Sequence, residues 1–212
     1  MLLLMPLVLQ AQNHKGKTLN DRDTIPLFRG VAVSFDLVGV IQSGLGDYGQ
    51  YEAAARLNLR DRYFPVVELG VGHADADDVD SGLRYKTSAP YGRVGVDFNV
   101  LRNKHDVNRV YVGGRYGYTS FKYDVDGTAV KAPVWGDDVE YSYKDNSANC
   151  HWLELVAGVD ARIWGPLRLG WSLRYKRKLT AKDPAIGKAW YIPGYGRYDD
   201  RIGGTFNVII EL

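Results

Sequence analysis

The chain has 212 residues, a net charge of +2 and a single cysteine, which together exclude several classes of protein. One cysteine cannot build a disulfide framework or a zinc cluster, and the small net charge gives no sign of nucleic-acid binding. No apolar run reaches the roughly 18 residues of a transmembrane helix. Gly (24 residues) and Tyr (15 residues) are both abundant, which favours an all-β protein.

The first residues carry the pattern of an export signal. An unbroken apolar run from Met1 to Leu9 precedes Gln10-Ala11-Gln12, and this order is typical of a signal peptide with a small-residue cleavage site. The alternative is a buried strand or the start of a helix, because no Lys or Arg precedes the run. We expect residues 1–11 to be the signal peptide, residues 12–28 a periplasmic segment and residues 29–212 the folded domain.

After residue 29, apolar and polar residues alternate in eight windows, as in strands whose two faces meet different surroundings. In the clearest window, residues 93–100, four apolar residues alternate with Arg, Gly, Asp and Asn. Helical spacing fits none of the windows. They comprise residues 31–42, 51–60, 67–72, 93–100, 110–119, 153–162, 167–175 and 201–212.

The connections between these windows alternate in length. Short connections cover residues 60–65, 102–108 and 164–166, and long ones cover residues 74–90, 124–149 and 180–199. The first connection, residues 43–47, is short although it belongs to the end with the long loops. An even number of strands with this asymmetry is typical of outer-membrane barrels. The sequence therefore predicts an all-β, eight-stranded antiparallel transmembrane β-barrel with both chain ends on the periplasmic side.

Three features predict that the polar face of each strand points into the barrel. This face is rich in Gly, its acids and arginines balance in number, and aromatic residues gather near the strand ends. We expect a lumen filled by salt bridges, because eight strands enclose little more space than side chains occupy and Arg pairs well with carboxylates. A soluble barrel with its polar face outside is the alternative.

The predicted lumen network contains Asp36, Glu52, Arg56, Glu68, Arg93, Asp97, Arg115, Glu154, Asp160, Arg168, Arg174 and Glu211, with Arg162 and Arg201 on the same face. The aromatic residues expected near the strand ends, in girdles on the outer surface at the membrane interfaces, are Tyr48, Tyr51, Tyr63, Phe64, Tyr91, Trp152, Trp164 and Tyr175.

Over residues 29–212 this pattern resembles the small outer-membrane β-barrels of the OmpA and OmpX type. The sequence around Ala11-Gln12 is most similar in style to barrel families of Bacteroidota. The resemblance implies a location in the outer membrane of a Gram-negative bacterium. One departure is the end of the chain, Ile210-Glu211-Leu212, because such barrels usually end in an aromatic residue and Phe206 is the nearest one.

Candidate sites for chemistry are few, and we expect no cofactor, no metal site and no enzyme activity. Asp75, Asp77, Asp78 and Asp80 could bind Ca²⁺, but an acidic loop exposed to solvent is the preferred explanation, because the spacing lacks the Gly and the distal Glu of an EF-hand loop. His73 and His151 lie on the lipid-facing side without a nearby Ser on their own strands, which a catalytic pair would need. A basic run, which could attract phosphorylated lipids, comprises Arg174, Lys176, Arg177, Lys178, Lys182 and Lys188.

The long connections carry aromatic residues that could anchor a protein partner, or could pack on one another. They are Trp135, Tyr141, Tyr143, Trp190, Tyr191 and Tyr195. We therefore predict a non-enzymatic outer-membrane barrel that acts as an accessory or scaffold subunit. Its partners would be outer-membrane lipids or lipopolysaccharide and a surface lipoprotein or a larger complex of envelope biogenesis. A lipid A-modifying or lipopolysaccharide-binding barrel and a small pore are the alternatives.

Overall fold

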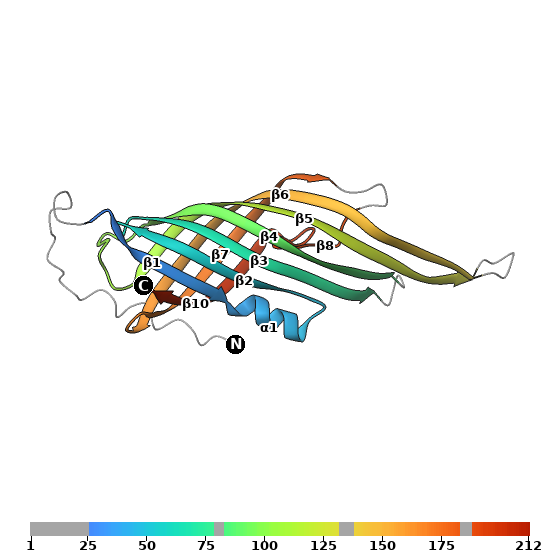
Figure 1. The fold of residues 1–212 in the computed structure, drawn as a ribbon, viewed down its shortest axis with the longest axis horizontal. Coiled ribbons are helices and arrows are strands. Elements are labelled where there is room, and N and C mark those ends of the chain that lie inside the picture. Colours follow the sequence, from blue (N-terminus) through green and yellow to red (C-terminus); the bar gives the residue numbers. More distant parts are fainter. Residues whose placement is uncertain (1–25, 79–82, 132–137, 183–187) are drawn as a thin grey trace.

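The structure is a computed structural model and describes residues 26–78, 83–131, 138–182 and 188–212. Within these ranges, eight antiparallel strands form a closed barrel in the order β1-β10-β7-β6-β5-β4-β3-β2 (Figure 1). The barrel strands are β1 (Phe28–Asp36), β2 (Tyr48–Leu59), β3 (Tyr63–Asp78), β4 (Leu83–Asn99), β5 (Arg109–Lys131), β6 (Asp138–Trp164), β7 (Leu167–Lys182) and β10 (Ile202–Glu211). The predicted eight-stranded antiparallel β-barrel is confirmed.

The two faces of each strand differ in polarity, as the alternation predicts. On β4, Arg93 and Asp97 are 2% and 0% exposed, whereas Val94 and Phe98 are 52% and 47% exposed. Successive side chains of a strand point to opposite faces, so the charged residues face the lumen and the apolar residues cover the outside.

Large aromatic rings fill part of the lumen, and inward-facing glycines make room for them. A Cβ atom added at Gly117 would lie 2.2 Å from the Trp152 ring, and one added at Gly70 would lie 2.5 Å from the Tyr91 ring. Trp152 and Tyr91 are buried, as is Phe64. Their expected place near the outer surface is therefore wrong, because they lie on the inward parity of their strands.

The other aromatic residues expected near the strand ends do lie on the outside or at the barrel mouth. Tyr51, Tyr63, Trp164 and Tyr175 are all more than 40% exposed. Tyr48 is partly buried and packs against Trp190 with ring centroids 5.7 Å apart.

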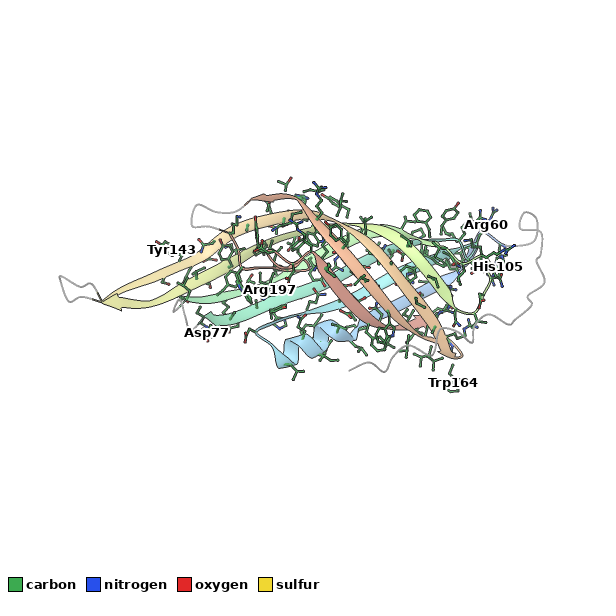
Figure 2. The ribbon with its side chains drawn as sticks, turned by 180° about the vertical axis from the view of Figure 1, so that it is seen from behind. Arg60, Asp77, His105, Tyr143, Trp164 and Arg197 are labelled. Carbon is green, nitrogen blue, oxygen red and sulfur yellow. The ribbon has the colours of Figure 1, made fainter. Side chains whose placement is uncertain are left out.

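Short turns close one end of the barrel, and long strands extend from the other. Arg60 and His105 mark the turn end, and Asp77 and Tyr143 mark the extended end (Figure 2). The predicted long connections are wrong in part, because β3 and β4 pair as far as Asp78 and Leu83, and β5 and β6 as far as Lys131 and Asp138. These strand extensions were not predicted because polar residues occupy both of their faces, so that apolar and polar residues do not alternate.

The first predicted strand is also shorter than expected. β1 ends at Asp36, and residues 37–45 form helix α1 (Leu37–Leu45). The Asp36 carboxylate accepts hydrogen bonds from the backbone N–H groups of Val38 (3.1 Å) and Gly39 (3.2 Å), which satisfies donors that a helix start leaves unpaired. Among the described residues, no helix has the length and hydropathy needed to cross a membrane.

Helix α1 takes the place of the missing half of β1 in the barrel wall (Figure 1). The pairing of β1 with β10 stops at Asp36, and α1 contacts both β2 and β10 beyond that point. The helix approaches β2 closely, because a Cβ atom at Gly39 would lie 2.4 Å from the carbonyl oxygen of Gln50.

Candidate functional site

A cluster of arginines and carboxylates fills the lumen. Arg93 on β4 contacts Glu52 (2.9 Å), Glu68 (2.8 Å) and Glu154 (3.2 Å), which lie on β2, β3 and β6. Arg174 on β7 contacts the same three carboxylates at 2.8–3.4 Å. Two arginines therefore tie five strands together across the inside of the barrel, and all five side chains are at most 7% exposed.

The cluster continues through two further arginines. Arg115 binds Asp97 with two parallel hydrogen bonds of 2.7 and 2.9 Å and reaches Glu68 at 3.0 Å. Arg56 joins Asp97 (3.3 Å) to Asp160 (2.6 Å). Two-pronged Arg–carboxylate pairs are strong and geometrically specific, so the network holds the strands in fixed positions.

Two buried aromatic side chains complete the hydrogen bonding of these carboxylates. The Tyr91 hydroxyl donates to Glu52 Oε2 over 2.6 Å, and the Trp152 indole donates to Glu154 Oε1 over 2.7 Å. The sequence pattern placed both rings at the outer surface. Trp152 instead shares the inward face of β6 with Glu154, two residues further on, and the strand register aligns Tyr91 with Glu52 through Gly70 on β3.

A second cluster lies toward the turn end of the barrel. Arg168 Nη1 lies 3.0 Å from Glu211 Oε2, and Arg109 contacts the other oxygen of the same carboxylate. Arg162 reaches Glu211 at 3.5 Å, but its side chain is 45% exposed. Arg109 was missed from the sequence because it lies just before the predicted strand of residues 110–119.

Asp61, in the turn between β2 and β3, gathers several partners at the turn end. His105 Nδ1 lies 2.7 Å from its Oδ2, Asn58 donates to its Oδ1 over 2.7 Å, and Arg29 forms an ion pair with it. Burial raises the pKa of Asp61, but hydrogen bonds from His105 and Asn58 and the charges of Arg29 and Arg109 outweigh burial and hold the pKa below its usual value.

Two network predictions need correction. Asp36 is buried, but it caps α1 and accepts the backbone N–H of Phe206 over 3.2 Å, and no arginine among the described residues pairs with it. Arg201 is exposed at the start of β10 and lies outside the lumen. β1 ends at Asp36, so this carboxylate caps the helix that follows, and β10 begins only at Ile202, so Arg201 lies outside the strand.

The last long connection folds back into the mouth of the barrel. A small hairpin of β8 (Tyr191–Ile192) and β9 (Gly196–Arg197) carries residues 191–195, all of which are buried. We call residues 191–197 the plug hairpin. Tyr191 and Tyr195 are 1% and 2% exposed, so their predicted role as partner contacts is wrong.

Hydrogen bonds hold the plug hairpin in the mouth. The Tyr85 hydroxyl donates to the Tyr191 carbonyl over 2.8 Å, and the Tyr191 hydroxyl donates to the Gly49 carbonyl over 3.1 Å. The Lys176 ammonium donates to the Tyr195 carbonyl. Backbone carbonyls thus anchor the hairpin to β4, β2 and β7.

The other predicted contact residues have different positions. Trp190 and Tyr143 remain 38% and 45% exposed, and Tyr143 lies near the extended end (Figure 2). The backbone of Tyr141 pairs with Gly127 between β6 and β5, while Trp135 lies outside the described residues. Trp190 and Tyr143 are therefore the predicted contact residues that the described part of the chain exposes on its surface.

The acidic segment at the end of β3 is neutralised by basic side chains. Asp75 accepts two hydrogen bonds from Arg84, of 2.9 and 3.0 Å, and Asp77 lies 3.5 Å from the same guanidinium. The Asp78 side chain and Asp80 lie outside what the structure describes. Among the described side chains, no group of three His, Cys, Asp or Glu could hold a metal ion.

A serine and a histidine meet where α1 packs against the barrel. Ser43 Oγ lies 2.9 Å from His73 Nε2 and 3.0 Å from the Tyr51 hydroxyl, and the Tyr51 and His73 rings stack. The sequence pattern missed this pair because it placed Ser43 in a loop after a strand. The other predicted histidine, His151, lies 2.6 Å from the Tyr116 hydroxyl.

Comparison with known proteins gives a structural likeness and a family. No curated protein matches the chain. The N-terminal β-barrel domain of Pseudomonas aeruginosa OprF is similar, with 10% sequence identity, a TM-score of 0.35 and coverage of 87% of this chain and 99% of that one. The model of the domain of unknown function DUF6048 matches residues 1–211, so the chain belongs to the DUF6048 family.

Proposed function

We propose that the chain is a β-barrel of the outer membrane of a Gram-negative bacterium, with residues 1–11 as its export signal and residues 12–28 on the periplasmic side. The exposed apolar face supports this, because soluble proteins rarely expose apolar patches larger than a few hundred Å². This face includes Leu69, Val94, Leu155, Val159 and Leu173, each at least 45% exposed.

The spacing of the outward aromatic residues supports the same placement. Tyr63 and Phe98 lie at the turn end of the wall with ring centroids 5.7 Å apart, and Tyr51 stacks on His73 at the other end. The ten residue steps from Tyr63 to His73 span roughly 33 Å along the strand at about 3.3 Å per residue. At a tilt of about 40°, this corresponds to roughly 25 Å across the membrane, the height of the apolar band in such barrels.

We further propose that the barrel does not conduct and instead acts as an accessory or scaffold subunit. The observation that carries this proposal is the buried network of Arg93, Arg174 and their three shared carboxylates below the plug hairpin. Because the lumen is filled, we place the function of the barrel on its outer surface. β5 and β6 extend farthest beyond the barrel (Figure 1) and are 23 and 27 residues long.

The long β5–β6 hairpin is the platform that we propose for a protein partner, either a surface lipoprotein or a larger envelope-biogenesis complex. Among the described residues, β5 pairs only with β6 beyond its register with β4, which ends at Gly127. Just before that point Tyr143, which pairs with Val125, is exposed, and Lys122 pairs with Asp145 at 3.0 Å on the surface. An exposed Tyr beside polar groups is the composition that protein interfaces favour.

Affinity purification of the tagged chain from its native membrane tests this proposal. In one variant, an Asn-Gly turn replaces residues 124–145 between Tyr123 and Asn146, which pair across the hairpin. In the matched control, the same turn replaces residues 77–84 between Ala76 and Tyr85, which pair between β3 and β4. Asn-Gly suits a two-residue hairpin turn.

We expect a stoichiometric partner to co-purify with the wild type and with the β3–β4 control, and to be lost from the β5–β6 variant. A wild-type barrel that always purifies alone would contradict the scaffold role, and so would a partner that survives the β5–β6 truncation.

A second candidate function is hydrolysis of an acyl ester in a membrane lipid, because Ser43 and His73 lie within hydrogen-bond distance on the outward side. A nucleophile needs such a base. Among the described residues, however, no carboxylate orients His73, as the third member of a catalytic triad would. An unchanged lipid mass profile in cells that carry Ser43→Ala would rule this activity out.

A further inference from the structure

An open pocket of about 560 Å³ lies at the rim of the barrel, between β7 and the segment that follows the plug hairpin. Its described walls combine basic and aromatic side chains with one carboxylate. The described lining residues are Tyr175, Lys176, Arg177, Lys178, Tyr195, Tyr198, Asp199 and Arg201. Four cations against one carboxylate among these described residues make the pocket attractive to anions.

Backbone carbonyls hold two cations of this pocket in place. Lys176 donates to the Tyr195 carbonyl, and Lys178 donates to the Tyr198 carbonyl over 2.5 Å. Among the described residues, no carboxylate lies within ion-pair distance of Arg177 or Arg201.

An apolar surface begins directly below the pocket. Leu173 and Tyr175 on β7 are 61% and 45% exposed, and Ile202 on β10, which pairs with Tyr175, is 68% exposed. Arg177 is the first charged residue on this outward face of β7 after Leu167. The change from apolar to basic therefore falls at the height where lipid headgroups meet acyl chains.

We propose that this pocket binds the phosphate groups of a phosphorylated lipid whose acyl chains lie along the outward face of β7 and β10. Lys and Arg at a membrane surface attract anionic headgroups, and Arg recognises phosphate oxygens with two parallel donors. The adjoining apolar face favours a lipid over free phosphate. This inference rests on the membrane placement proposed above, but not on the protein partner.

Binding to the purified full chain in a non-ionic detergent tests the proposal. The probes are bisphosphorylated lipid A, the same lipid after removal of both phosphates, and inorganic phosphate. The test variant is the triple Arg177→Gln, Lys178→Gln, Arg201→Gln. The control, Lys86→Gln, Lys122→Gln, Lys144→Gln, removes the same charge from exposed positions on β4, β5 and β6.

We expect wild type and control to bind bisphosphorylated lipid A with similar affinity, and the test variant to bind it roughly 100-fold more weakly, at about fivefold per basic residue. The pocket assignment would be overturned by equal losses in both triple variants, by unchanged binding in the test variant or by equally tight binding of the dephosphorylated lipid. Inorganic phosphate that competes as strongly as the lipid would show that no lipid is selected.

These results are independent of the scaffold proposal, because they are measured on the isolated barrel. A test variant that still co-purifies its partner but loses lipid A would support both proposals. Each variant is judged to be folded if heating changes its mobility in gel electrophoresis as it does that of the wild type.

Discussion

Arg93 and Gly194 join the lumen network to the plug hairpin. Arg93 Nη2 donates a 2.9 Å hydrogen bond to the Gly194 carbonyl, while its Nη1 contacts the Glu52 and Glu68 carboxylates. One buried guanidinium therefore connects the strands to the segment that covers the barrel mouth.

Arg93→Gln should weaken the barrel and loosen the plug. Removing one member of a buried ion pair costs about 3–5 kcal/mol, because a buried charge is left without its partner. We expect a lower unfolding temperature in detergent and transient current steps in planar bilayers. Arg162→Gln is the control, since that side chain is 45% exposed. Recordings without current steps, together with an unchanged unfolding temperature for Arg93→Gln, would show that Arg93 does not hold the plug hairpin in place.

Gly194→Ala should displace the plug hairpin. Gly194 has a φ of +79°, and a Cβ atom there would lie 2.4 Å from the Tyr91 ring. An L-amino acid pays a steric cost in this conformation, and the buried ring cannot easily move. We expect faster trypsin cleavage after Arg197. Gly44→Ala is the control, because no atom lies within 4 Å of its added Cβ, and equal cleavage of both variants would argue against a packed plug.

The helix at Asp36 gives a third prediction. Asp36→Ala removes the cap of α1, at about 1 kcal/mol, and leaves the partly buried Phe206 N–H without its acceptor, at up to about 1–3 kcal/mol. We expect a lower unfolding temperature for Asp36→Ala, and a smaller loss for Asp36→Asn, whose side-chain oxygen still accepts. Equal losses in the two variants would mean that the carboxylate charge, rather than the cap, is what matters.

The turn end gives a pH prediction through Asp61. Its pKa in the folded chain lies below its ordinary value of about 3.8. The ionised form is therefore favoured by folding, and this stabilisation is present above pH 3.8 and lost as the pH falls through the folded pKa. Between pH 7 and pH 2 in detergent, the unfolding temperature of Asp61→Asn should fall by less than that of the wild type. Identical profiles would show that the ionisation of Asp61 does not contribute to the pH dependence of stability.

The barrel and its charged interior could be read from the sequence because strand alternation is local. Arg93 and Asp97 share one parity of a single strand, and any closed sheet turns them to the same side. The pairing of Arg93 with Glu52 and Glu154, in contrast, depends on the register between strands. That register is set by contacts among distant residues, which a single sequence does not reveal.

The misplaced elements have the same physical origin. Leu37, Gly39 and Ile41 continue the alternation of β1, yet the carboxylate of Asp36 starts a helix. Tyr191 and Tyr195 have the composition of an exposed contact loop, but hydrogen bonds from distant strands draw them into the mouth. Tertiary contacts overrode the local pattern at each place.

The central claim is that the apolar outside of the barrel lies in a membrane, and the native tryptophans allow a direct test. Trp171 faces outward and is 57% exposed, whereas Trp152 is buried in the lumen at 0%. Two variants, each with only one of these tryptophans and Phe at the other tryptophan positions, are reconstituted in vesicles that contain brominated lipids.

The account predicts strong quenching of Trp171 by brominated lipid, weak quenching by aqueous iodide, and little effect of either quencher on Trp152. Quenching of Trp171 by iodide, with no effect of brominated lipid, would place the apolar wall in water and contradict the account.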